Sequence, residues 1–117
     1  MSTVLIVDAF PAVRKALRRL LERQLCSVDA IAKTEVSRPD LIILDLCMPE
    51  MNGFEAARVL RETMPQIPIL MFTSHDSRDV ESQAASVGIR AVFSKLTGIN
   101  ALLSQTSKLL SPSHAMA

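Results

Sequence analysis

The sequence is poor in aromatic residues and lacks any long hydrophobic run. It has no Trp or Tyr and only four Phe, although 49% of its 117 residues are hydrophobic, so its core must be mainly aliphatic. No apolar stretch approaches the roughly 20 residues that a transmembrane helix needs. The first apolar run reaches Asp8 within a few residues, so we expect neither a signal peptide nor a membrane association. The total length of 117 residues predicts one compact domain.

An excess of charge of one sign is also absent. Thirteen basic residues face twelve acidic ones, so no overall charge favours nucleic acid or an anionic membrane. One basic run has no aromatic residues between its cations, and its spacing is typical of the solvated face of an amphipathic helix, so we expect no direct nucleic-acid partner. This run comprises Arg14, Lys15, Arg18, Arg19 and Arg23.

Cysteine is scarce as well. Cys26 and Cys47 form no metal-ligand pattern. Two thiols in a chain of this kind are typical of a reducing compartment, so we expect a cytoplasmic location.

Short apolar runs alternate with amphipathic segments along the chain. The runs show no polar alternation, which is typical of strands buried on both faces of a parallel sheet. Strand–helix alternation predicts such a sheet with helices on both faces. The expected strands are 3–8, 41–45, 67–73 and 91–95. The expected helices run from Pro11 to about Gln24, from Gly53 to Pro65, from Ser77 to Gly88, and over 99–110.

Individual residues support these helices. Pro11 suits a first helical turn, Ser77 is a good N-cap, and Gly88 suits the left-handed position after a helix. The apolar face of the first helix is expected to contain Val13, Leu17, Leu20, Leu21 and Gln24. That of the second is expected to contain Phe54, Ala57, Leu60 and Met64.

The segment between the first helix and the strand at 41–45 is short. Its sixteen residues, Leu25 to Asp40, cannot hold a strand, a turn and a full helix, given typical lengths. The pattern over 27–33 favours an edge strand with at most one helical turn after it. The competing interpretation makes 29–37 a helix and omits the strand. Either arrangement leaves an edge or a face uncovered, which favours a homodimer.

Polar residues follow each expected strand. Asp8, Asp45, Thr73 with Ser74, and Lys95 would meet at the carboxyl-terminal edge of the sheet, where open α/β sheets bind ligands. Carboxylates, a hydroxyl and an ammonium can together hold Mg²⁺ and a phosphoryl group. Asp45 could attack phosphorus as a nucleophile.

These residues make the chain resemble the receiver domain of bacterial response regulators over residues 3–110. The matching features are Asp8 with Pro11, the run Leu-Asp-x-x-Met-Pro-x-Met-Asn-Gly around Asp45, Thr73, and Phe93-x-Lys95. The details are most similar to receivers that precede helix-turn-helix outputs. The resemblance implies a flavodoxin-like, doubly wound sheet of five parallel strands in the order 2-1-3-4-5. Residues 1–110 would form the receiver, and residues 111–117 a tail or linker.

The resemblance also implies roles for single residues. Asp45 would accept a phosphoryl group from a histidine kinase or a small phosphodonor. Asp8, Asp45 and the main-chain carbonyl of Cys47 would hold Mg²⁺. Thr73 and Phe93 would be a switch pair that alters the face built from the family's fourth helix, fifth strand and fifth helix, where a downstream protein binds. Such a domain is a switch and not an enzyme. Further residues expected to line the site are Ser74, His75 and Cys47.

Ala9 is the main departure from the family pattern. The family usually has a second acidic residue here, and that residue contacts the metal directly, so Ala9 predicts weak Mg²⁺ binding. Two interpretations stay open: a phosphorylatable receiver, and a pseudo-receiver that acts only as a protein-interaction module. Phe10 replaces a residue that is often polar, and Leu96 stands where many receivers have Pro.

Two other classes fit less well. A flavodoxin-like flavin-binding protein needs a Ser/Thr/Gly-rich loop after the first strand, where this chain has Phe10 to Val13. A haloacid-dehalogenase-type phosphatase needs a second Asp two residues after its nucleophile, where this chain has Cys47.

Overall fold

Five parallel strands form the centre of the molecule. The computed structural model describes residues 2–25, 28–31, 38–48 and 51–110. The strands lie in the order β2-β1-β3-β4-β5, and every neighbouring pair is parallel. The predicted doubly wound sheet and its strand order are therefore confirmed. The strands are β1 (Ser2–Val7), β2 (Val28–Ile31), β3 (Leu41–Leu44), β4 (Ile69–Thr73) and β5 (Ala91–Ser94).

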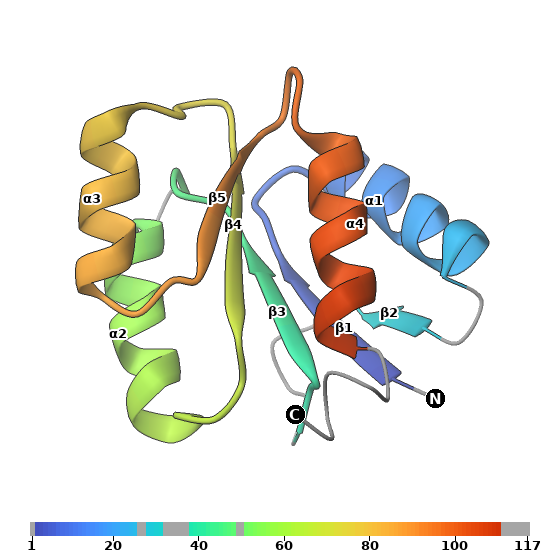
Figure 1. Ribbon diagram of the computed structural model, residues 1–117, viewed down its shortest axis with the longest axis horizontal. Helices are drawn as coiled ribbons and strands as arrows, with labels where there is room; N and C mark the ends of the chain where they lie inside the picture. Colours follow the sequence, from blue (N-terminus) through green and yellow to red (C-terminus); the bar gives the residue numbers. More distant parts are fainter. Residues whose placement is uncertain (1, 26–27, 32–37, 49–50, 111–117) are drawn as a thin grey trace.

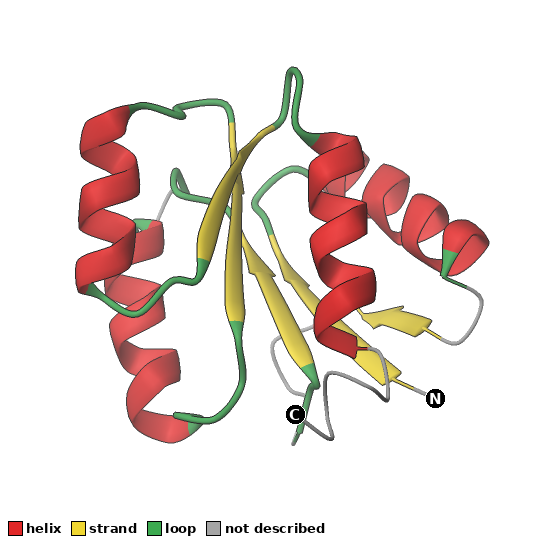
Figure 2. Ribbon diagram, viewed as in Figure 1, coloured by secondary structure: helices red, strands yellow, loops and turns green. Residues whose placement is uncertain are grey.

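The helices cover the two faces of this sheet in pairs. Figure 1 shows α1 and α4 on one side of the strands and α2 and α3 on the other, and Figure 2 shows the resulting three layers. None of the helices in the described residues is both long enough and apolar enough to cross a membrane. The helices are α1 (Pro11–Gln24), α2 (Gly53–Thr63), α3 (Arg78–Ser86) and α4 (Ile99–Leu110).

The central strand β3 shows why the apolar runs carry no polar alternation. All four of its residues are buried. Leu41 and Ile43 pack in a cluster with Leu17 of α1 and residues of α4. Ile42 and Leu44 pack in a second cluster with Ala57 of α2 and residues of α3. A strand buried on both faces needs apolar residues at every position.

The helix ends follow local sequence signals. Asn52 and Ser77 cap α2 and α3, since their side chains accept hydrogen bonds from the main-chain N–H groups three residues on, at 2.9 Å and 3.1 Å. Gly88 follows α3 with a φ of +85°, so its predicted left-handed conformation is confirmed. Gln24 was assigned to the apolar face of α1, which is wrong, because it is exposed at the last position of that helix.

The short segment before β3 contains an edge strand. β2 pairs with β1 from Ser2↔Val28 to Leu5↔Ile31, which confirms the strand interpretation for residues 28–31. The competing helix over 29–37 is wrong at its start, because the backbone there forms ladder hydrogen bonds. Residues 32–37 lie outside the described residues, as does the predicted tail at 111–117. α3 and α4 stand on either side of β5 in the chain. The face predicted from the family's fourth helix, fifth strand and fifth helix therefore corresponds to α3, β5 and α4.

Gly53 allows α2 to begin directly against the strand end that carries Asp45. Its N–H donates to the carbonyl of Leu46 at 2.6 Å. A Cβ at this position would collide with the main-chain oxygen of Asp45 and lie 2.8 Å from the Cα of Leu46. The close approach of two backbones therefore requires glycine.

We expect Gly53→Ala to destabilise the domain by about 1–3 kcal/mol, the usual cost of overpacking. The direction of this change in stability is informative, because alanine ordinarily stabilises a helix relative to glycine by about 0.5–1 kcal/mol. Urea denaturation followed by circular dichroism measures the change. A variant as stable as the wild type would contradict the backbone contact described here.

Candidate functional site

The strand ladder brings the predicted site residues to one edge of the sheet. Asp8 and Asp45 directly follow Val7 and Leu44, which are paired across β1 and β3. Lys95 follows Ser94, which is paired with Thr73 across β4 and β5. The main chain continues this order beyond the strands, because the N–H of Asp45 donates to Val7 at 2.9 Å and that of Lys95 donates to Thr73 at 2.9 Å.

Lys95 bridges the two carboxylates of Asp8 and Asp45, which we call the acidic pair. Its Nζ lies 2.7 Å from Oδ2 of Asp8 and 3.2 Å from Oδ2 of Asp45. The side chains of Asp8 and Asp45 are only 4% and 3% exposed, and that of Lys95 is 14% exposed. Two carboxylates this close and this buried repel each other, so the ammonium between them is what makes the arrangement tolerable.

The environment of Lys95 acts on its charge in two opposing ways. Burial lowers its pKa, but the hydrogen bond to Asp8 and the Coulombic attraction of Asp45 and Asp8 raise it more strongly. The net effect holds the pKa of Lys95 above the ordinary value of 10.5. Lys95 therefore remains a cation at neutral pH.

The loop after β1 adds a second set of contacts to Asp8. Oδ1 of Asp8 accepts a hydrogen bond from the N–H of Phe10 at 2.9 Å. Nη1 of Arg14 donates to the carbonyl oxygen of Asp8 at 2.5 Å. The ring centroid of Phe10 lies 5.5 Å from Nζ of Lys95, within cation–π range. The half-buried Arg14 was assigned to a solvated face, so its place beside Asp8 was missed.

Thr73 is fully buried at the end of β4. Its Oγ1 accepts a hydrogen bond from the N–H of His75 at 3.2 Å. Phe93 is half-buried and packs against the core cluster beneath α1 and α4. The side chains of Ser74, His75 and Cys47 are exposed on the loops that follow β4 and β3, and their part in the site stays a prediction.

The acidic pair offers a small set of metal ligands. Both carboxylates reach one ammonium, so a cation in this region would also be within reach of both. Ala9 supplies no side-chain oxygen, and in the described residues no three side chains of His, Cys, Asp or Glu form a metal cluster. Mg²⁺ is usually held by one or two carboxylates with phosphate oxygens and waters, so these residues fit a weakly bound Mg²⁺.

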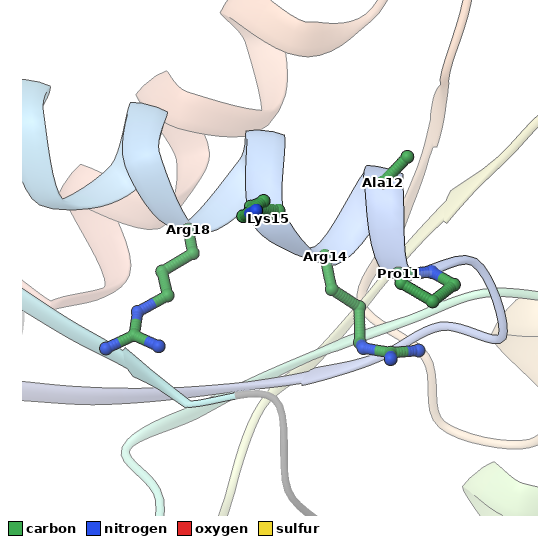
Figure 3. Close-up of a pocket in the computed structure, with 5 residues that line it drawn as sticks. All are labelled: Pro11, Ala12, Arg14, Lys15 and Arg18. Atoms are coloured by element: carbon green, nitrogen blue, oxygen red, sulfur yellow. The ribbon is translucent and has the colours of Figure 1, made fainter.

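A separate surface pocket lies along α1. It is lined by Pro11, Ala12, Arg14, Lys15 and Arg18, and Figure 3 shows Arg14 and Arg18 extending from the same side of the helix. Arg18 pairs with Glu22 one turn on, at 3.0 Å. All the lining residues belong to one helix, and none is Asp8, Asp45 or Lys95, so this pocket is not the strand-end site.

The charge bridge predicts a specific loss of stability in alkali. A lysine whose pKa is raised on folding stabilises the native state below its unfolded pKa, and that contribution is lost as the pH rises through the folded value. We therefore expect the free energy of unfolding to fall above pH 10.5. At neutral pH, Lys95→Gln should cost about 3 kcal/mol, because it leaves the acidic pair without its cation.

Urea denaturation of both proteins from pH 7 to pH 12 measures this difference. The wild type should be more stable than Lys95→Gln at neutral pH and should lose this extra stability at the alkaline end. The remaining lysines titrate in both proteins, so their effect cancels in the comparison. An advantage that is independent of pH would contradict the charge bridge.

Comparisons of the sequence and the fold with known proteins identify the family of this chain. The family model of the response regulator receiver domain matches residues 4–107. The response regulator MprA of Mycobacterium sp. (strain KMS) is 33% identical over 114 residues, which cover 92% of this chain and 50% of that protein. The chain thus spans about half the length of the curated relatives it matches.

Solved structures show the same relationship. The chemotaxis protein CheY4 of Vibrio cholerae has a TM-score of 0.79 at 28% identity, with 94% of this chain and 99% of that chain covered. A LuxR-family two-component response regulator from Aurantimonas sp. has a TM-score of 0.83 at 26% identity, with 99% and 94% covered. The chain belongs to the response regulator receiver domain family of two-component signalling.

Proposed function

We propose that this receiver accepts a phosphoryl group on Asp45 and thereby switches an interaction surface. The observation that carries the proposal is the buried bridge from Lys95 to Asp8 and Asp45. This bridge supports the proposal, because one carboxylate would serve as the nucleophile, the ammonium would neutralise phosphoryl oxygens, and the second carboxylate would help hold a metal. Receiver domains generally bind Mg²⁺ at the phosphorylation site, and they are signalling proteins that receive phosphoryl groups from histidine kinases and small phosphodonors.

The chemistry requires little of the protein beyond positioning and charge. An oxygen of Asp45 forms a bond to phosphorus while the donor's P–N or P–O bond breaks. The electron pair of that bond leaves with the imidazole or the carboxylate of the donor. Lys95 would neutralise charge on the transferred oxygens, and the Thr73 hydroxyl would donate to one of them. Bound Mg²⁺, held by Asp8, Asp45 and the Cys47 carbonyl, would supply further positive charge.

The proposed output surface consists of α3, β5 and α4. β4 and β5 pair in register from Phe72↔Phe93 to Thr73↔Ser94, so Thr73 and Phe93 stand one register position apart on neighbouring strands between the site and this surface. We expect the Thr73 hydroxyl to move toward a phosphoryl group and Phe93 to change its packing in response. Repacking of Phe93 would then change the surface that a downstream protein contacts. A homodimer through an exposed sheet edge stays a second prediction for this domain.

Ala9 favours a second candidate function. A pseudo-receiver with the same fold would bind its partners without phosphorylation, because the site has one carboxylate fewer than the family pattern. The two functions differ in whether Asp45 becomes covalently modified.

Incubation with acetyl phosphate distinguishes the two functions. We expect intact-mass analysis to show one phosphoryl adduct that requires Mg²⁺ and is absent from Asp45→Asn. The control variant removes the nucleophilic oxygen with little change in volume. No adduct at saturating Mg²⁺, in a protein with a native circular dichroism spectrum, would support the pseudo-receiver instead.

Restoring the missing acid should strengthen the metal site. We expect Ala9→Asp to bind Mg²⁺ about ten-fold more tightly, a gain of about 1.4 kcal/mol that a nearby unit charge can readily supply. Phosphorylation at limiting Mg²⁺ should accelerate in parallel. Ala9→Asn is the matched control, because it adds similar volume without the charge. Equal affinity in Ala9→Asp and Ala9→Asn would contradict the assignment of residue 9 to the metal site.

A further inference from the structure

Phe10 is an aromatic residue held beside the acidic pair without being part of the core. It is 59% exposed, although phenylalanine is usually buried. Its side chain therefore contributes little to folding by burial. An explanation for its position has to come from what the ring contacts.

The backbone of Phe10 is held on both sides. Its N–H donates to Oδ1 of Asp8 at 2.9 Å. Its carbonyl accepts from the N–H groups of Val13 and Arg14 at 3.1 Å each, which begins α1. Pro11, the next residue, restricts the backbone of Phe10 further. These contacts fix where the ring begins, whatever side chain stands at position 10.

The ring lies next to the one ammonium that bridges the acidic pair. Nζ of Lys95 is 5.5 Å from the ring centroid while it contacts Asp8 and Asp45. The ammonium thus has an anionic oxygen from each carboxylate and an aromatic ring around it. The ring attracts it without removing a carboxylate oxygen from the site.

A metal ion and the ammonium need the same two carboxylates. The site has no acidic side chain at Ala9 that could hold the metal while Lys95 stays in place. Any interaction that stabilises Lys95 on the acidic pair therefore weakens the binding of Mg²⁺ by up to the same factor. A partly exposed cation–π contact of this kind corresponds to a factor of about two to five.

We propose that Phe10 is a positioning residue that holds the Lys95 ammonium on Asp8 and Asp45 and thereby raises the Mg²⁺ concentration that the site requires. The inference deepens the proposed function, because it concerns the metal of the same site. It assigns the threshold for metal binding to two features of this chain, the absence of an acid at Ala9 and the ring at position 10.

Mg²⁺ titration of the unphosphorylated protein tests this directly, with the amide resonances of residues 8–10 as the signal. Phe10→Leu keeps the apolar bulk and removes the ring, so its dissociation constant for Mg²⁺ should fall about two- to five-fold. Phe10→Tyr should remain close to the wild type. Phe10→Trp should bind Mg²⁺ more weakly than the wild type, because Trp makes the strongest cation–π contacts.

A double-mutant cycle with Lys95→Gln separates the ammonium from other effects of the ring. In the Lys95→Gln background, the Leu, Tyr and Trp variants should all bind Mg²⁺ equally well. An effect of Phe10→Leu that persists in this background would overturn the proposal, as would equal or undetectable Mg²⁺ binding in the wild type and Phe10→Leu. No phosphodonor is present, so the result is independent of whether Asp45 is phosphorylated.

Discussion

The structure depends most on one long-range ionic contact, the bridge from Lys95 to Asp8 and Asp45. The lysine follows β5, whereas the carboxylates follow β3 and β1, so the contact spans the strand ends across the sheet. Neighbouring strands lie about 4.8 Å apart, and only a long side chain can reach across β4. Without this cation, two carboxylates would be buried side by side with no counter-charge, at a large cost. The bridge therefore links the strand order to the stability of the site.

The same contact makes the site responsive. In a partly buried position each charge interacts more strongly than in water, so a small change in the charge around the acidic pair has large consequences. A phosphoryl group on Asp45 would add negative charge and oxygen acceptors where the Lys95 ammonium already lies. Ala9 lacks the negative charge that the family pattern provides at this position. The ring of Phe10 lies within cation–π range of the Lys95 ammonium.

Local signals in the sequence were sufficient for most of the fold. Continuous apolar runs identified β1, β3 and β4, because strands buried on both faces leave no other pattern. The run at β5 was also identified, although this edge strand is only half-buried. Ser77 and Gly88 marked the ends of α3 through capping and a left-handed turn, which depend on neighbouring residues alone. The segment after the first helix was ambiguous, since its pattern over 27–33 favoured a strand while a helix over 29–37 stayed possible. The strand at 28–31 is stabilised by pairing with β1. Gln24 was misassigned because the next residue, Leu25, packs against the core cluster at that end of α1.

The residues that stand at the strand ends follow from local patterns in the sequence, and they identify the family to which the chain belongs. A carboxylate placed directly after a buried strand has a location that local structure alone decides. The three-dimensional fold sets which groups lie together. One ammonium contacts both carboxylates, Arg14 binds the carbonyl of Asp8, and the ring of Phe10 lies near Lys95. These contacts join separate loops or depend on how one loop bends, and no periodicity in the sequence records distances of that kind.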